Sequence, residues 1–242
     1  MKAVGYTESL TIDDPKSLQD VELPQPAAEG RDLLVRVRAI GVNPVDFKVR
    51  QRAAAEPGET KVLGWDAVGE VVATGEAASL FEPGDQVYYA GDVTRQGSNA
   101  EYQIVDERIV GRKPASLNDA EAAALPLTTI TAWEMLFDHL GLEQQPPEEI
   151  SPTDDVILVV GAAGGVGSIL IQLAKTLTGA TVVATASRPE SRQWVESLGA
   201  DFVVNHREPL LPQIEQLVSE GKIAPITHVA SLNATDQYFD DY

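Results

Sequence analysis

The chain of 242 residues has no cysteine, few basic residues and no long hydrophobic run. Because cysteine is absent, the protein forms no disulfide and has no thiolate to serve as a nucleophile or metal ligand. Only 18 Lys and Arg stand against 37 Asp and Glu, which gives a formal net charge of −19. Nucleic-acid affinity comes largely from Lys and Arg that neutralise phosphates. The charge balance therefore argues against nucleic acid and anionic membranes as partners.

Two further absences narrow the class of protein. The sequence has no run of about 18 apolar residues, the length that a membrane-spanning helix requires. Residues 1–6 lack the apolar core of a signal peptide, so we expect a cytoplasmic protein. The hydrophobic content of 43% and charged content of 23% are those of an ordinary soluble globular protein.

The most informative stretch present is residues 156–177. Five apolar residues precede a glycine-rich turn that ends at Gly167, and an amphipathic segment follows from 169 to 177. This order predicts a strand, a tight turn and a helix, an arrangement in which glycines and free helix N–H groups bind a pyrophosphate. Ala162 replaces the first glycine of the usual G-x-G-x-x-G, and a turn that only closes helix–strand packing is the alternative.

Further elements follow at the spacing of βαβ units. Apolar runs at 181–185 and 201–205 enclose a helical segment at 189–198, and a helical segment at 211–221 precedes a fourth run at 226–231. This alternation predicts a doubly wound parallel sheet with strand order 3-2-1-4. Such a sheet usually has about six strands. We therefore expect a dinucleotide-binding domain that is incomplete at its C-terminal end.

The first half of the chain has a different pattern, with short predicted strands separated by Gly and Pro turns. The expected strands are 33–40, 67–75, a turn and strand at 82–89, and 100–105. This pattern is typical of a small barrel or sandwich.

Helical spacing begins after Asn118, which is a suitable N-cap. It is interrupted at Pro126 and resumes over residues 128–140. We accordingly expect a β-rich domain at 1–125 and an α/β domain at 126–242.

Several motifs in this order resemble the medium-chain dehydrogenase/reductase superfamily, in particular its zinc-free quinone oxidoreductase branch, often labelled zinc-type alcohol dehydrogenase-like. The matching segments are GVNPVDFK at 41–48, LGWDAVG at 63–69, PGDQV at 83–87, GSNAEY at 97–102, AAALP at 122–126 and GAAGGVG at 161–167. The resemblance implies a GroES-like β-barrel domain followed by a Rossmann domain. It also implies a chain shorter than other members at the C-terminus.

In zinc-dependent members of the family, the position of Asn43 holds a cysteine and that of Trp65 a histidine. Both ligands are missing here, as is the four-cysteine lobe that binds a structural zinc. The sequence has three histidines, and none lies in a ligand motif: His139, His206 and His228. A catalytic zinc needs about three protein ligands. We therefore predict that the protein binds no metal.

The end of the second predicted strand indicates which dinucleotide binds. An NAD enzyme usually carries Asp or Glu there to bind the ribose 2′-OH. This chain has Ala186 followed by Ser187 and Arg188, a hydroxyl and a guanidinium suited to the 2′-phosphate of NADPH. By resemblance, His206 contacts the same phosphate; the alternative for Arg188 and His206 is a solvated surface position. The remaining cofactor contacts implied by the resemblance are Thr131, Ala163, Gly164, Gly165, Val166, Leu232 and Asn233.

The resemblance implies transfer of hydride from NADPH to a quinone or an α,β-unsaturated carbonyl without a metal. Asn43, Asp46 and Lys48 are the candidate catalytic residues and are expected to line the cleft between the domains. Asn43 would donate to substrate or cofactor, Asp46 would hold the local network, and Lys48 would reach the nicotinamide ribose or an enolate oxygen. Structural alternatives are a turn at Asn43 and a helix cap at Asp46. Trp65 and Tyr89 are expected to be packing residues.

Two other functions remain to be weighed. The first is a dinucleotide-binding protein with little or no catalysis, in a sensing or structural role. The second, a zinc alcohol dehydrogenase, conflicts with the missing ligands. The expected partner is a small-molecule quinone or enone; dimers are usual in the family, and the oligomeric state stays open.

Overall fold

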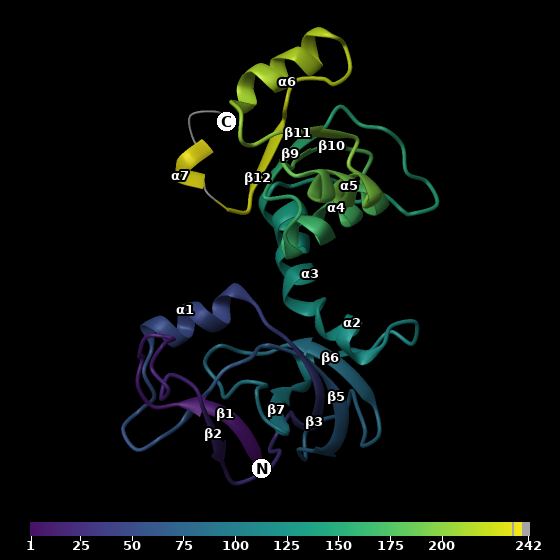
Figure 1. Cartoon of the computed structure of the whole chain (residues 1–242). Coiled ribbons are helices and arrows are strands. Elements are labelled where there is room, and N and C mark those ends of the chain that lie inside the picture. The colour runs from purple at the N-terminus through teal and green to yellow at the C-terminus, as the bar shows by residue number, and fades with distance from the viewer. Residues whose placement is uncertain (234, 239–242) are drawn as a thin grey trace. The chain divides into compact units, whose positions relative to one another are not determined.

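The computed structural model describes residues 1–233 and 235–238, and the chain divides into two compact units, Met1–Leu127 and Thr128–Tyr242 (Figure 1). Each unit is built around its own sheet or pair of sheets and has its own hydrophobic core. Among the described residues, no helix is both long enough and apolar enough to cross a membrane. The expected order, a β-rich unit followed by an α/β unit with a parallel sheet, is present.

The first unit contains a five-stranded antiparallel sheet in the order β7-β3-β5-β6-β8 and a three-stranded sheet in the order β2-β1-β4. The strands are β1 (Lys2–Tyr6), β2 (Gln19–Glu22), β3 (Asp32–Gly41), β4 (Lys61–Val62), β5 (Asp66–Thr74), β6 (Gln86–Ala90), β7 (Tyr102–Asp106) and β8 (Gly111–Arg112). The four strands expected from alternation correspond to β3, β5, β6 and β7. Their inward-facing residues, including Leu33, Val35 and Val71, form the core of the larger sheet.

Helix α1 (Pro44–Arg52) interrupts the β-rich unit and was not assigned from the sequence pattern. Its apolar and polar residues do not follow the usual burial rule: Phe47 is 49% exposed, whereas Arg50 is 5% exposed. The Arg50 guanidinium donates from Nη1 to the carbonyl oxygen of Leu10 at 2.6 Å. Because a buried arginine and an exposed phenylalanine remove the apolar stripe, periodicity does not reveal this helix.

Two short helices follow the barrel. Asn118 caps α2 (Asp119–Ala123), as expected, by accepting the Glu121 N–H at 2.9 Å. Helix α3 (Pro126–Trp133) starts at the proline that ends the preceding helical run. It continues into a π-helical segment, Glu134–His139, so the helix expected at 128–140 is present with a change of winding in its second half.

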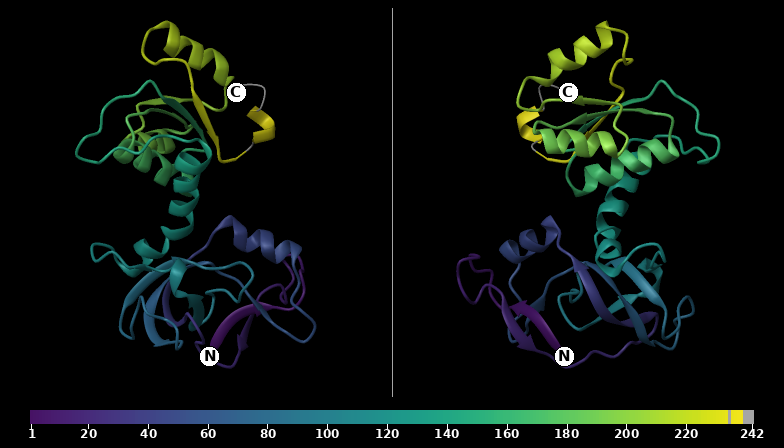
Figure 2. Two further views of the ribbon diagram at one scale, coloured as in Figure 1. Left: turned by 180° about the vertical axis from the view of Figure 1, so that it is seen from behind. Right: turned by 45° about the vertical axis from the view of Figure 1, so that its right-hand side comes forward.

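The second unit is a parallel sheet in the order β11-β10-β9-β12, which confirms the predicted 3-2-1-4 order. Its elements are β9 (Val156–Val160), α4 (Gly165–Leu177), β10 (Thr181–Thr185), α5 (Pro189–Ser197), β11 (Phe202–Val204), α6 (Leu210–Ser219), β12 (His228–Ser231) and α7 (Thr235–Tyr238). Figure 2 shows α4 and α5 on one face of the sheet and α6 on the other.

All five residues of β9 are buried because both faces of the sheet are covered. Ile157 and Val159 pack in the cluster with α4, whereas Val156, Leu158 and Val160 pack in the cluster with α6. This alternation explains why the sequence shows a continuous apolar run. It also fixes β9 as the central strand, whose carboxyl end leads into the glycine turn.

Gly167→Ala tests how tightly α4 sits on β9. A Cβ at Gly167 would lie 2.5 Å from the carbonyl oxygen and 2.6 Å from the Cα of Ala162, so helix and turn must separate. We expect a loss of about 1–3 kcal/mol in the free energy of unfolding, as for other overpacked sites. The measurement is urea unfolding followed by circular dichroism.

The matched control is Gly164→Ala in the same turn. A Cβ there would meet only the Gly161 carbonyl oxygen, at 3.3 Å. This variant should unfold within about 1 kcal/mol of the parent, the range for exchanges at an N-cap. Equal stability of the two variants would contradict the packing role assigned to Gly167.

Candidate functional site

The glycine turn after β9 opens the first turn of α4 toward solvent. Gly161 has φ +80°, a conformation that glycine adopts without the strain that other residues incur. This residue, rather than position 162, therefore makes the tight turn, and Ala162 is fully buried in the core. The replacement of the first motif glycine by alanine is thus a packing change that leaves the turn intact.

Helix α4 begins with backbone groups available to an anion. Gly164 is its N-cap, and its first turn contains no acidic residue. The first N–H groups of a helix have no partner within the helix, and they carry the positive end of its dipole. The predicted contacts Gly164 and Gly165 are exposed, although a Cβ on Gly165 would lie 3.1 Å from the Thr128 methyl, and the half-buried Ala163 and Val166 pack against the core beside them. The turn can therefore hold a pyrophosphate, the group for which this geometry is suited.

A second group of predicted residues lies where β10 and β11 end. The Ser187 hydroxyl and Nε2 of His206 are 3.1 Å apart. Burial lowers the pKa of His206, and the charges of Arg207 and Arg188 lower it further. Both arginines are exposed and close enough to act on the ring. The structure therefore brings Ser187, Arg188 and His206 into one cationic corner, and it adds Arg207, which the sequence argument missed.

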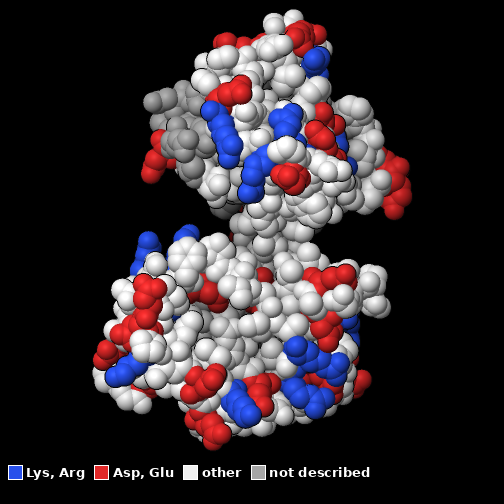
Figure 3. All heavy atoms as spheres, viewed as in Figure 1, with Lys and Arg blue, Asp and Glu red and all other residues white. Residues whose placement is uncertain are grey.

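Arg192 is a second residue that sequence reasoning missed. Its guanidinium donates to the carbonyl oxygens of Ala186, at 3.4 Å, and Val203, at 3.2 Å. These bonds tie the end of β10 to the end of β11 and hold the cationic corner together. Its position four residues after Arg188 on the same helix is the signal that could have found it. Figure 3 shows several Lys and Arg side chains close together on the drawn face of this unit.

The other predicted cofactor contacts of the second unit are placed as follows. Leu232 follows β12, and its N–H donates to the carbonyl oxygen of Val160 at 3.1 Å. The Asn233 side chain lies over the turn, since a Cβ on Gly161 would be 2.6 Å from its Oδ1. Thr131 is half-buried on α3. Leu232 and Asn233 thus lie beside the glycine turn, at the carboxyl edge of the sheet.

In the first unit, the structure places Asn43 and Asp46 in a buried polar cluster with Asp66. The exposed fractions are 8% for Asn43, 8% for Asp46 and 1% for Asp66. Asp46 accepts the backbone N–H of Asn43 at 2.7 Å, and Asp66 accepts from Asn43 Nδ2 at 2.7 Å. Burial raises the pKa of Asp46, and it raises the pKa of Asp66 to about 6. Lys48, by contrast, is exposed on α1 and outside this cluster.

Asp66 was not among the residues singled out from the sequence, although it lies within the LGWDAVG motif. It is the first residue of β5, whose first four residues are all buried. Its second oxygen, Oδ1, accepts the Leu127 N–H at 2.7 Å. An acidic residue at the first, buried position of a strand is the signal that could have identified it.

The residues at the two zinc-ligand positions do not fit a zinc site. Trp65 is 1% exposed and packs with Tyr6 and Leu63, in keeping with the expected packing role. Its indole N–H can only donate, so it offers no lone pair to a metal. The Asn43 amide is bound to Asp66. In residues 1–233 and 235–238, no group of three or more His, Cys, Asp or Glu is placed to hold a metal ion.

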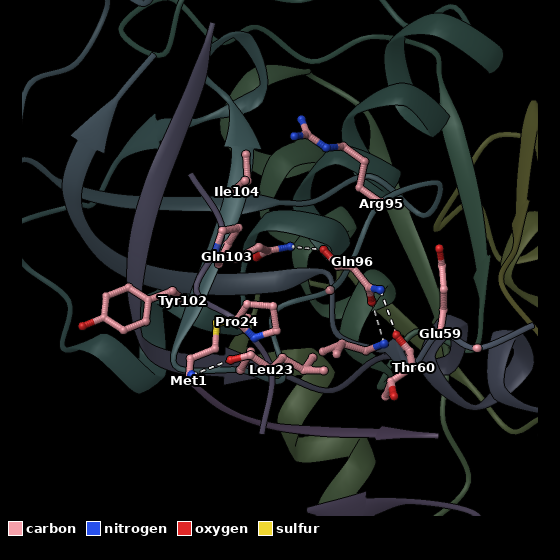
Figure 4. A pocket seen from close by; sticks show the side chains of 15 residues that line it. Met1, Leu23, Pro24, Glu59, Thr60, Arg95, Gln96, Tyr102, Gln103 and Ile104 are labelled. Atoms are coloured by element: carbon pink, nitrogen blue, oxygen red, sulfur yellow. Dashed lines mark hydrogen bonds between the residues drawn. The ribbon is translucent and has the colours of Figure 1, made fainter. Parts of the chain in front are cut away.

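A cavity of about 570 Å³ lies elsewhere in the first unit (Figure 4). It is lined by the N-terminus, the segment after β2 and parts of β7, and it includes none of the predicted site residues. Its amides are already engaged: Gln96 binds the backbone of Thr60 and Val62, and Gln103 donates to Gln96. The polar groups of this cavity therefore do not indicate a ligand.

Comparison with known proteins agrees with both units. The model of the alcohol dehydrogenase GroES-like domain matches residues 29–115, and that of the zinc-binding dehydrogenase matches residues 165–240. A zinc-type alcohol dehydrogenase-like protein of Staphylococcus aureus (strain MRSA252) is 42% identical over 240 residues, covering 99% of this chain and 69% of that protein. The 2-methylene-furan-3-one reductase of Solanum lycopersicum is 39% identical over 217 residues, covering 85% of this chain and 52% of the reductase.

Solved structures give the same result. A putative zinc-dependent alcohol dehydrogenase protein from Rhizobium etli CFN 42 superimposes with a TM-score of 0.91 and 49% identity, covering 100% of this chain and 68% of that one. The Escherichia coli quinone oxidoreductase complexed with NADPH gives 0.76 and 26%, covering 100% and 69%. Fold, motif order and these matches agree, and the chain belongs to the medium-chain dehydrogenase/reductase superfamily, a family of dinucleotide-binding oxidoreductases.

Proposed function

We propose that the protein is a metal-independent reductase that uses NADPH to reduce quinones or α,β-unsaturated carbonyls. The observation that carries the proposal is the cationic corner of Ser187, Arg188 and His206 at the ends of β10 and β11. The residue at the end of β10, where an NAD enzyme carries a carboxylate, is Ala186, which is 1% exposed. A 2′-phosphate therefore meets a guanidinium and a hydroxyl without a repelling acid.

Local donors are essential because the chain as a whole repels an anionic cofactor. The formal net charge is −19. Salt screens exposed charges over about 8 Å at physiological ionic strength, so distant carboxylates act weakly on a bound phosphate. The α4 N-terminus would hold the pyrophosphate and the Ser187–Arg188–His206 corner would hold the 2′-phosphate. Ala163, Gly164, Gly165 and Val166 belong to the first of these sites, with Thr131, Leu232 and Asn233 as the proposed contacts nearer the nicotinamide.

When bound, NADPH supplies the hydride, which goes to the β-carbon of an enone or to a quinone. The protein's own task is then to stabilise the negative charge that develops on the substrate oxygen. Asn43 is proposed to donate from its side chain to substrate or cofactor, and Lys48, an exposed cation on α1, to neutralise charge at the ribose or the enolate oxygen. Asp46 holds Asn43 in place through the backbone bond. The substrate class agrees with the name of one relative, the 2-methylene-furan-3-one reductase.

Turnover tests the proposal directly. The chain should oxidise NADPH in the presence of a simple quinone or a conjugated enone, measured as loss of absorbance at the nicotinamide band. Saturated ketones and primary alcohols should be inert, because without a Lewis acid the protein has too little to polarise them. NADPH binding without turnover of any quinone or enone would instead support a dinucleotide-binding protein that lacks catalysis.

Arg188→Ala tests the choice of cofactor. Loss of one charge-assisted hydrogen bond of about 1.5–3 kcal/mol should weaken NADPH binding about 10- to 100-fold and leave NADH binding unchanged. The measurement is titration of both nucleotides by fluorescence. Lys222→Ala is the control, since it removes one exposed positive charge from the same unit, and Lys222 forms an ion pair with Glu220, two residues away in the chain. Equal weakening in the two variants would show that only net charge matters.

The pH dependence of NADPH binding tests His206. Burial and two arginines hold its pKa below the usual value, so the free protein carries it neutral at pH 7. A phosphate dianion beside the ring raises the pKa, and binding therefore takes up a proton. Affinity should rise about three- to tenfold as pH falls from about 8 to 6.5. NADH binding should not vary with pH in this range, and neither should NADPH binding by His206→Gln. A flat profile for the parent protein would contradict the contact.

A further inference from the structure

Asp66 is a buried carboxylate whose hydrogen-bonding partners are all neutral. Its side chain is 1% exposed, and it accepts from the Leu127 N–H and from Asn43 Nδ2, each at 2.7 Å. The charged group that acts on Asp66 is the Asp46 carboxylate on α1, which has the same sign of charge. Burying an acid in this way is costly. A protein that only needed to fill this position could use an apolar residue, so the carboxylate calls for another explanation.

The two oxygens of Asp66 have different partners. Oδ1 faces a backbone N–H, which can only donate and cannot turn away. Oδ2 faces the side-chain amide of Asn43, which can present either its NH₂ or its oxygen after a half-turn about the last bond. An ionised carboxylate only accepts, so it forces the NH₂ toward itself. The Asn43 Oδ1 and the second N–H then point away from Asp66.

The main chain of Asn43 is held independently. Its backbone N–H donates to Oδ2 of Asp46 at 2.7 Å, at the start of α1. Asp46 therefore fixes where Asn43, the N-cap of α1, is; the Asp46 backbone N–H faces the Asn43 side chain in a capping box, and Asp66 draws the NH₂ of that amide toward itself. The two carboxylates have separate effects on one residue, and separate substitutions can distinguish them.

We propose that Asp66 is a positioning residue, which sets whether the amide of Asn43 offers its oxygen or its NH₂ group to a bound substrate or cofactor. Only the last step, the contact between Asn43 and a ligand, rests on the proposed reductase function. The orientation of the amide is a property of the protein alone.

The fixed donor at Oδ1 determines what happens when position 66 is neutral. A proton on Asp66 must sit on Oδ2, because Oδ1 receives the Leu127 N–H. The Asn43 amide then turns and accepts that proton's hydrogen bond with its own oxygen, which directs both N–H groups away. Burial and the charge of Asp46 raise the pKa of Asp66 to about 6, while the bonds from Asn43 and Leu127 oppose the rise.

Asp66→Asn reproduces the neutral arrangement at every pH. Its oxygen must face the Leu127 N–H, so its NH₂ faces Asn43 and compels the same turn of the amide. The variant should fold as well as the parent protein. A carboxyl whose pKa is raised by folding stabilises the protein below its unfolded pKa, and that stabilisation is lost as pH rises through the folded pKa. For Asp66 the loss occurs near pH 6. The variant with asparagine does not lose stability in this way.

The first test needs no substrate. In ¹⁵N-labelled protein, the side-chain NH₂ signals of Asn43, identified by their absence in Asn43→Ser, should shift between pH 5 and 7.5 with a midpoint near 6. In Asp66→Asn, these signals should stay at the low-pH position throughout. Asp46→Asn is the matched control: it removes the neighbouring charge while keeping an acceptor for the Asn43 backbone. It should retain the titration with a lower midpoint, because a like charge is gone.

The second test uses turnover of a quinone or enone at saturating NADPH. Parent protein and Asp66→Asn should have the same kcat/KM at pH 5, where both carry a neutral residue 66. They should differ by about tenfold at pH 7.5, the equivalent of one exchanged hydrogen bond. A merely structural role for Asp66 would give a ratio that does not change with pH.

The outcomes separate the two proposals. If no acceptor is turned over, the reductase function fails, and the amide signals still decide the role of Asp66. If the Asn43 signals do not respond to pH in the parent protein, or respond equally in Asp66→Asn, the positioning role is overturned even for an active enzyme. A constant activity ratio between pH 5 and 7.5 overturns it as well.

Discussion

The contact between the first turn of α4 and the end of β9 is the constraint on which the second unit depends. Gly167 lies against the backbone of Ala162 with no room for a side chain, and Gly161 makes the turn with φ +80°. This contact aims the N-terminus of α4 at the carboxyl edge of the parallel sheet. Because β10, β11 and β12 end at that edge, Ser187, His206 and Asn233 follow their strands into the same region. The position of a helix N-terminus at the carboxyl edge of the sheet is thus a direct consequence of one close packing contact.

Glu107 and Asp66, two of the three buried acids among the described residues of the first unit, show how the chain controls charge. Glu107 accepts from the N–H groups of Ser79 and Leu80 and from Arg31, and these bonds, led by that of Leu80, lower its pKa. Asp66 has neutral donors and a like-charged neighbour, and its pKa rises to about 6. The carboxyl of Glu107 is therefore held ionised, whereas the pKa of the Asp66 carboxyl is raised toward neutral pH. A carboxylate that serves only to tie loops together has the first environment, and one poised to change state has the second.

The residues at the two zinc-ligand positions of this chain differ in chemistry from those of zinc-dependent relatives. The positions that hold ligands in zinc-dependent relatives carry Trp65, which fills the core with Tyr6 and Leu63, and Asn43, which is bound to Asp66. Removing a metal from such a site leaves acids and space that must be satisfied by other means. Here the indole takes up the space, and the amide satisfies the acid. At these two positions the chain therefore has an indole and an amide engaged with Asp66 in place of metal ligands.

The sequence by itself determined the order and type of most elements and the order of the parallel strands. Hydrophobic alternation identified β3, short runs punctuated by Gly and Pro identified β5 and β7, and the glycine motif with its flanking runs identified β9, α4 and β10. These patterns follow from local geometry and two-sided burial. Contacts of the kind expected for Ser187 and His206 also follow from the rule that parallel strands end at one edge. Helix α1 was not predicted because its exposed Phe47 and buried Arg50 reverse the usual pattern of apolar residues inside and charged residues outside.

Only the tertiary structure decided which polar residues meet. Asp66 lies 23 residues from Asn43 and 61 from Leu127 in the chain, and nothing local indicates that all three join in one network. Arg192 and Arg207 likewise gain their roles only when α5 and the end of β11 come together. Secondary structure is encoded in neighbouring residues, whereas the environment of a buried charge depends on segments far apart in sequence. For that reason the sequence could predict the fold, but the pKa of Asp66 and the orientation of Asn43 required the folded chain.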